Sequence, residues 1–157
     1  MVGIDGFERM GDAVDAFAVF SFTIPGVPLI YSGQEASLNK RLLFFEKDTI
    51  NWSNTTKQAF YEKLVDLKND NEALWNGAAG GDFNILETSS EKAFAFSRNK
   101  GNNHLVAIFN FSPEEAIINI PSISAGQYTD YFSAEKTEIT APASLTLPAW
   151  GYKILIQ

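Results

Sequence analysis

The order of hydrophobic and polar positions changes in character near residue 80. Before it, apolar residues recur mostly at three- and four-residue spacing over 8–22 and 55–69, which predicts two helices. After it, short alternating segments separated by polar turns predict eight strands. We place these strands at 83–87, 92–98, 104–111, 115–120, 127–132, 136–140, 144–148 and 151–156. Such spacing is typical of an antiparallel sandwich or barrel, so we expect an α+β chain whose second half is a β-sandwich.

Residues 27–31, VPLIY, form a short continuous apolar run between the two predicted helices. Pro28 cannot donate to a sheet ladder but suits the first residue of a strand. A strand that is apolar on both faces is typical of a parallel sheet covered by helices, so the pattern predicts one helix-to-strand step of an α/β fold. Its partner strands would have to come from elsewhere. We therefore expect residues 8–31 either to self-associate or to fold over the strand or onto the sandwich.

Composition narrows the class of protein. The 157 residues are 45% hydrophobic and 20% charged, which is typical of a globular chain. A net charge of −7 argues against nucleic-acid binding, because phosphate contact needs clustered Lys and Arg. There is no cysteine, and no apolar run reaches the roughly 18 residues of a membrane-spanning helix. We expect neither a nucleic-acid partner nor a membrane segment.

Residues 11–35, GDAVDAFAVFSFTIPGVPLIYSGQE, resemble the last helix–strand step of the catalytic barrel in the α-amylase family of glycoside hydrolases. The eighth barrel strand of that family has the pattern Gly-x-Pro-x-Ile-Tyr-x-Gly-x-Glu. The matching residues here are Gly26, Pro28, Ile30, Tyr31, Gly33 and Glu35. KRLLFFEKDTINW, 40–52, resembles the loop after that strand, and 55–69 resembles the eighth barrel helix.

The rest of the chain resembles the C-terminal β-sandwich of the same family, called domain C. EALWNG, 72–77, resembles its start, and LTLPAWGYKILI, 145–156, resembles its last hairpin. The resemblance implies that residues 1–73 are the C-terminal end of a (β/α)8 barrel and residues 74–157 are domain C. The chain would then be the C-terminal end of such an enzyme, following its last catalytic motif.

The family resemblance implies a parent enzyme that acts on α-glucosidic bonds of starch-like glucans with a retaining, two-carboxylate mechanism. The three catalytic carboxylates of the family precede the helix with which this chain starts. The single histidine, His104, is not followed by Asp and cannot be the family's motif histidine. We therefore expect no catalytic residue in this chain and no activity of the chain alone. The compartment stays unknown, with a secreted or periplasmic parent as one reading.

The resemblance implies no cofactor for this chain. Calcium is conceivable in the parent enzyme, but no site is seen here. Glu46 and Asp48 lack the regular spacing of oxygen ligands found in calcium loops, so we expect no metal site.

Four residues form the candidate substrate-cleft loop of the intact enzyme: Tyr31, Gln34, Glu35 and Arg41. They follow the predicted strand at its carboxyl end, and barrel enzymes place their active sites at that face. The alternative is that Glu35 is an ordinary loop carboxylate, paired with Lys40 or Arg41.

Tyr131 and Trp150 are candidate sugar-stacking aromatics of the β-domain. Exposed aromatic rings can stack on pyranose faces, although aromatic residues are also normal core residues of a sandwich. This leaves two alternatives to a structural part of a hydrolase. One is a non-catalytic glucan-binding module, and the other is an interaction domain without a ligand.

Overall fold

A computed structural model describes residues 9–43 and 45–157, so residues 1–7 and the predicted helix start at residue 8 lie outside the described residues. The elements in chain order are η1 (Gly11–Ala13), α2 (Val14–Thr23), α3 (Gln58–Asp70), η2 (Glu72–Leu74), η3 (Gly77–Ala79), β1 (Asp82–Leu86), β2 (Ala93–Lys100), β3 (Asn103–Asn110), β4 (Ala116–Ile120), β5 (Gly126–Asp130), β6 (Lys136–Ile139), β7 (Ala143–Leu147) and β8 (Tyr152–Ile156).

The eight strands form two antiparallel sheets. The larger sheet has the strand order β1-β2-β3-β8-β5-β6, and β4 pairs with β7 in a two-stranded sheet. The α+β class and the eight predicted strands are therefore confirmed, and each strand end lies within two residues of the sequence-based range.

The first hydrophobic core lies between the two sheets. Its buried residues come from strands of both sheets and from the turn after β4. They are Ala93, Ala95, Val106, Ile108, Ile118, Ile120, Ile123, Tyr128, Ile139, Ala143, Leu147 and Leu155. This core makes the strands a sandwich.

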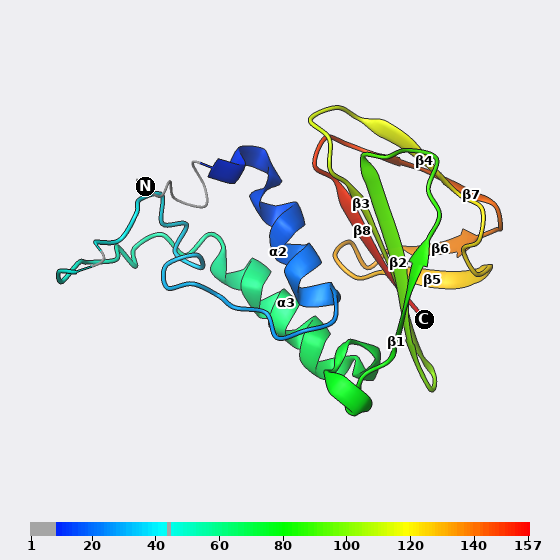
Figure 1. Ribbon diagram of the computed structural model, residues 1–157, viewed down its shortest axis with the longest axis horizontal. Helices are drawn as coiled ribbons and strands as arrows, with labels where there is room; N and C mark the ends of the chain where they lie inside the picture. Colours follow the sequence, from blue (N-terminus) through cyan, green and yellow to red (C-terminus); the bar gives the residue numbers. More distant parts are fainter. Residues whose placement is uncertain (1–8, 44) are drawn as a thin grey trace.

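The second core lies on the opposite face of the six-stranded sheet, which α2 and α3 cover (Figure 1). Its buried residues are Val19, Phe22, Tyr61, Leu64, Leu67, Leu74, Phe96, Leu105, Ala107, Phe109 and Ile154. The protein thus has three layers, and helices fold onto the sandwich, which is one of the arrangements expected from the sequence. The cluster joins residues on both sides of residue 73.

Both predicted helices form. α2 ends at Thr23 because Ile24 turns to an extended conformation before Pro25. α3 begins later than predicted, since the side-chain oxygen of Asn54 accepts a hydrogen bond from the amide two residues on and forms a separate turn. The residue before the first turn of α3 is Lys57, which makes no side-chain capping hydrogen bond.

The predicted strand at 27–31 is wrong as a strand, because this segment has no ladder partner among the described residues. Its side chains nevertheless alternate in burial as they do in a strand. Val27, Leu29 and Tyr31 are 83%, 81% and 60% exposed, whereas Ile30 packs against the core between helices and sheet. The physical reason is that the described strands all belong to the sandwich, and none lies beside this segment.

Candidate functional site

A tight turn follows the exposed segment and carries two of the predicted cleft residues. The side-chain oxygen of Gln34 accepts a hydrogen bond from the Tyr31 amide at 2.9 Å, and the Gln34 amide donates to the Tyr31 carbonyl at 3.0 Å. Gly33 has φ +97°, and a Cβ there would lie 2.8 Å from the side chain of Leu38. Glycine is therefore required for this turn. The structure brings Tyr31 and Gln34 together.

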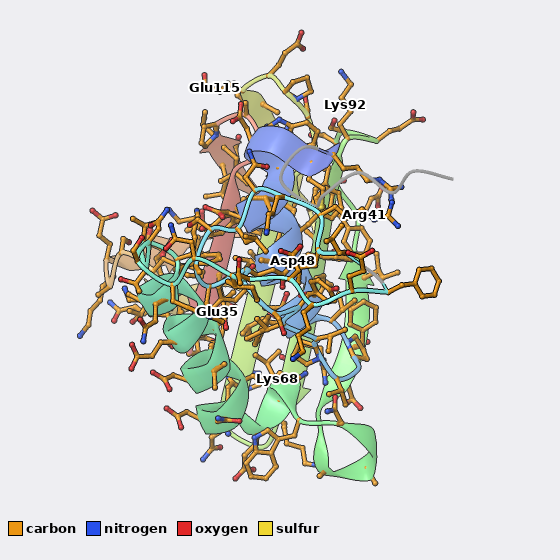
Figure 2. All side chains as sticks on the ribbon, turned by 90° about the vertical axis from the view of Figure 1, so that its left-hand side faces the viewer. Glu35, Arg41, Asp48, Lys68, Lys92 and Glu115 are labelled. Atoms are coloured by element: carbon orange, nitrogen blue, oxygen red, sulfur yellow. The ribbon has the colours of Figure 1, made fainter. Side chains whose placement is uncertain are left out.

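Glu35 lies in the same turn and turns its carboxylate inward. Its Oε2 is buried and has no hydrogen-bond partner among the described residues. The sequence left open an ion pair of Glu35 with Lys40 or Arg41. Lys40 pairs instead with Asp48, whose carboxylate lies 2.6 Å from the Lys40 ammonium. In Figure 2, Glu35 and Arg41 lie well apart on the loop that crosses in front of the helices. The structure therefore does not join Arg41 to the turn at 31–35.

Asp48 binds residues 40 and 43 of the same loop. One carboxylate oxygen contacts Lys40, and the Leu43 and Thr49 amides donate to the carboxylate at 3.0 and 2.7 Å. The Lys40 hydrogen bond and then these two amides lower the pKa of Asp48 to about 2. Glu46 and Asp48 belong to no metal-binding group, since no three His, Asp or Glu side chains come together in the part of the chain that the structure describes.

Tyr131, a predicted sugar-stacking residue, lies against the helical layer. Its ring packs on the core between helices and sheet, and its hydroxyl donates to the Lys63 carbonyl of α3 at 2.8 Å. Burial raises the pKa of Tyr131, and the nearby carboxylates of Asp66 and Asp70 raise it further. The hydroxyl is therefore engaged in joining the sandwich to α3.

Trp150, the other predicted stacking residue, lies in the turn between β7 and β8. It has φ +52° and is half-buried, and its amide donates to the Ser112 carbonyl at 2.9 Å. Trp75, in the linker before β1, is 40% exposed and its indole donates to the Asn69 carbonyl. His104 forms a hydrogen bond with the Asn99 side chain at 2.9 Å in the β2–β3 hairpin.

A polar link joins the two helices near the turn. The Lys57 ammonium contacts the two oxygens of the Asp15 carboxylate at 2.6 and 2.7 Å. Burial raises the pKa of Tyr61 to about 12, with smaller contributions from Asp15 and Glu35 nearby. The carboxylates of Asp15 and Glu35 therefore both lie near the Tyr61 phenol.

Sequence reasoning missed two buried cations. Arg98 on β2 is 2% exposed and Lys68 on α3 is 9% exposed. A signal for Arg98 was present in KAFAFSR, where it stands at two-residue spacing from Phe94 and Phe96 and so faces the same side of the sheet. Lys68 carried no comparable signal, because its position on the helix face alone does not distinguish a solvated lysine from a buried one.

No helix within 9–43 and 45–157 has the length and apolar character needed to span a membrane.

Comparison with known proteins gives consistent matches. Residues 83–154 match the family model described as the C-terminal domain of maltogenic amylase. The α-amylase MalA of Haloarcula japonica is 30% identical over 131 residues, which are 79% of this chain and 18% of that protein. The cyclomaltodextrinase of Thermoanaerobacter pseudethanolicus is 33% identical over 107 residues, which are 63% of this chain and 17% of that protein.

The fold matches solved structures over nearly the whole chain. A noncanonic maltogenic α-amylase, AmyB of Thermotoga neapolitana, superposes with a TM-score of 0.79 at 16% identity, covering 94% of this chain and 36% of that one. The strands of the sandwich therefore match a C-terminal domain of maltogenic amylase, and the fold of helices and sandwich together matches part of a maltogenic α-amylase. The chain belongs to the α-amylase family and corresponds to the C-terminal part of its members. It spans about a fifth of the length of the curated relatives.

Proposed function

We propose that this chain is the structural C-terminal portion of a glycoside hydrolase that acts on starch-like α-glucans by a retaining, two-carboxylate mechanism. In this proposal, residues 1–73 complete the barrel and residues 74–157 form domain C. The chemistry resides outside this chain. The curated relatives, an α-amylase and a cyclomaltodextrinase, support the substrate class. Tyr31, Gln34, Glu35 and Arg41 would then border the substrate cleft of the intact enzyme.

The observation that carries the proposal is the state of residues 27–31. They alternate in burial, pair with no strand among the described residues, and expose the side chains of Val27, Leu29 and Tyr31. An unpaired segment with an exposed apolar face is suited to pairing with a neighbouring strand. A last barrel strand that lacks its neighbours would have these properties.

Activity assays of the purified chain on starch and on an activated α-glucoside test whether the catalytic residues lie outside this chain. We expect no turnover above a buffer blank. Turnover that survives repurification would overturn the proposal. Retention on insoluble starch that is lost in Trp150→Ala would favour the glucan-binding module instead.

The exposed segment also leads us to propose that the chain self-associates through residues 8–31. Light scattering should show a concentration-dependent increase in mass, which Leu29→Lys reduces. Ile117→Lys is the matched control, because Ile117 on β4 is similarly exposed, at 65%. A strict monomer at all concentrations, or an equal effect of both substitutions, would contradict this proposal.

A further inference from the structure

The C-terminal end of α2 meets a buried arginine from the sandwich. One terminal nitrogen of Arg98 donates to the Thr23 carbonyl, the last of α2, at 3.3 Å. The other donates to the carbonyls of Trp75 and Gly81 at 3.3 and 3.4 Å. A cation at this end of a helix is favoured by the helix dipole and satisfies a carbonyl that has no partner within the helix. Arg98 therefore joins α2, the linker and the sheet.

A second buried cation holds the residue at which the chain turns away from α2. The Lys68 ammonium donates to the Gly26 carbonyl at 2.9 Å, and the side-chain oxygen of Asn76 accepts from the Gly26 amide at 3.3 Å. Burial lowers the pKa of Lys68, and the nearby Arg98 lowers it further. Residues 23–26 are thus held by Lys68 of α3, Asn76 of the linker and Arg98 of β2.

The linker is shaped to admit the arginine. A Cβ at Gly80 would lie 1.8 Å from the Trp75 carbonyl oxygen and 3.3 Å from a terminal nitrogen of Arg98. Two neighbouring buried cations cost free energy, and apolar side chains of similar volume often pack as well or better. Packing alone therefore does not explain a lysine at position 68, whereas a requirement to hold Gly26 does.

We propose that Arg98 and Lys68 are positioning residues that fix where segment 26–35 leaves the helical layer, and thereby where Gln34 and Glu35 stand relative to the sandwich. The position of that segment at a substrate cleft rests on the proposed function, whereas its anchoring to the sandwich does not. Figure 2 shows Lys68 on α3 and Glu35 on the loop on the same side of the molecule.

Distance measurements between two spin labels test the anchoring directly. The chain has no cysteine, so Ser32→Cys and Ser144→Cys, both at exposed positions, give two defined labels. Excess unlabelled chain keeps the measured distances within one molecule. The test variants are Lys68→Met and Arg98→Met, and Lys57→Met is the matched control. Lys57 also links α2 with α3, but through Asp15 at the other end of the pair.

Loss of a charged donor shifts the local equilibrium between held and released segment by roughly tenfold or more. The distance distribution should broaden or shift in Lys68→Met and Arg98→Met and stay unchanged in Lys57→Met. The thermal midpoint of Lys68→Met should stay the same or rise, because the variant no longer buries a charge. A merely structural lysine would instead lower the midpoint and leave the distribution unchanged.

An unchanged distribution in Lys68→Met, or equal broadening in the Lys57→Met control, overturns the proposal even if Arg98→Met fails to fold. The proposed hydrolase function is tested separately by the activity assays, so the two can fail independently.

Discussion

Phe20 is the ring by which α2 contacts the largest number of sheet aromatics, and its replacement by alanine tests how firmly the helical layer belongs to the sandwich. Its ring lies 5.5–6.4 Å from four others, those of Phe94, Phe96, Phe109 and Phe111. All four contacts are edge-to-face, with interplanar angles of 72–88°, and three of them are to residues of β2 and β3. Removing it leaves a space between two layers that cannot close without moving a helix.

A fully buried Phe→Ala change costs about 3–5 kcal/mol, and the half-buried Phe20 should fall near the lower end, at about 3 kcal/mol. For a chain of this size about 1 kcal/mol lowers the midpoint by roughly 2–4 °C, so we expect a decrease of roughly 6–12 °C. Phe17→Ala is the control, because Phe17 is 38% exposed and stacks on Phe111 alone at 4.9 Å. It should cost about 1 kcal/mol.

Urea unfolding of Phe20→Ala should be followed by circular dichroism at a helical wavelength and by the fluorescence of Trp150, with Trp52 and Trp75 replaced by Phe. Because both layers share one core, we expect the two signals to change together and to move together on substitution. The reasoning is refuted if the helical signal is lost first while the sandwich keeps its midpoint. It is also refuted if the cost does not exceed that of Phe17→Ala.

Three further predictions concern other parts of the molecule. Because the pKa of Asp48 is lowered from 3.8 to about 2, its carboxylate stabilises the loop above about pH 4, and this contribution disappears as the pH falls toward 2. Carboxyl NMR titration should show the lowered pKa of Asp48, and Lys40→Met should return that pKa toward 3.8. The pKa of Tyr61 is raised to about 12, so its neutral phenol stabilises the fold below about pH 10, and this contribution is lost as the pH rises through 12. Burial also raises the pKa of Tyr152 to about 12, so ultraviolet titration of Tyr61→Phe should lose part of the amplitude near pH 12 and keep the part that belongs to Tyr152. An unchanged amplitude near pH 12 would refute the assignment. Gly80→Ala would place a methyl group 1.8 Å from a carbonyl oxygen and should cost at least about 3 kcal/mol, whereas Gly101→Ala, at φ +55° in open space, should cost about 1–2 kcal/mol in thermal unfolding.

Much of the sandwich could be predicted because its strands are short, separated by polar turns, and patterned for burial. The segment VPLIY was read as a strand buried on both faces, and such a strand was assigned to a parallel sheet. The strand buried on both faces in the structure is β3, with Leu105 to Asn110 all buried, in an antiparallel sheet. The helices cover the face of β3 that points away from the second sheet. Burial of a strand on both faces therefore results from a third layer in this protein and does not require a parallel sheet.

The candidate site was harder to predict, because its properties depend on residues far apart in sequence. Gly26 is held by Lys68 and Asn76, 42 and 50 positions away. The sequence pattern identified the turn at 31–35 through its glycine and polar residues. It could not identify which cation would be buried at the end of α2, since a single Arg or Lys in an amphipathic element is usually solvated.

The second core is built from residues that the ribosome adds at different times. Phe96, on the sheet surface that α2 covers, follows Phe20 by about 75 residues, which at about 5–20 residues per second is roughly 4–15 s of synthesis. Ile154, at the sheet's centre, is made later still. During this interval the aromatic face of α2 has no surface of the sandwich to cover it. A nascent chain of this protein therefore depends on other surfaces, such as a chaperone or earlier-made parts of the polypeptide, until its last hairpin is complete.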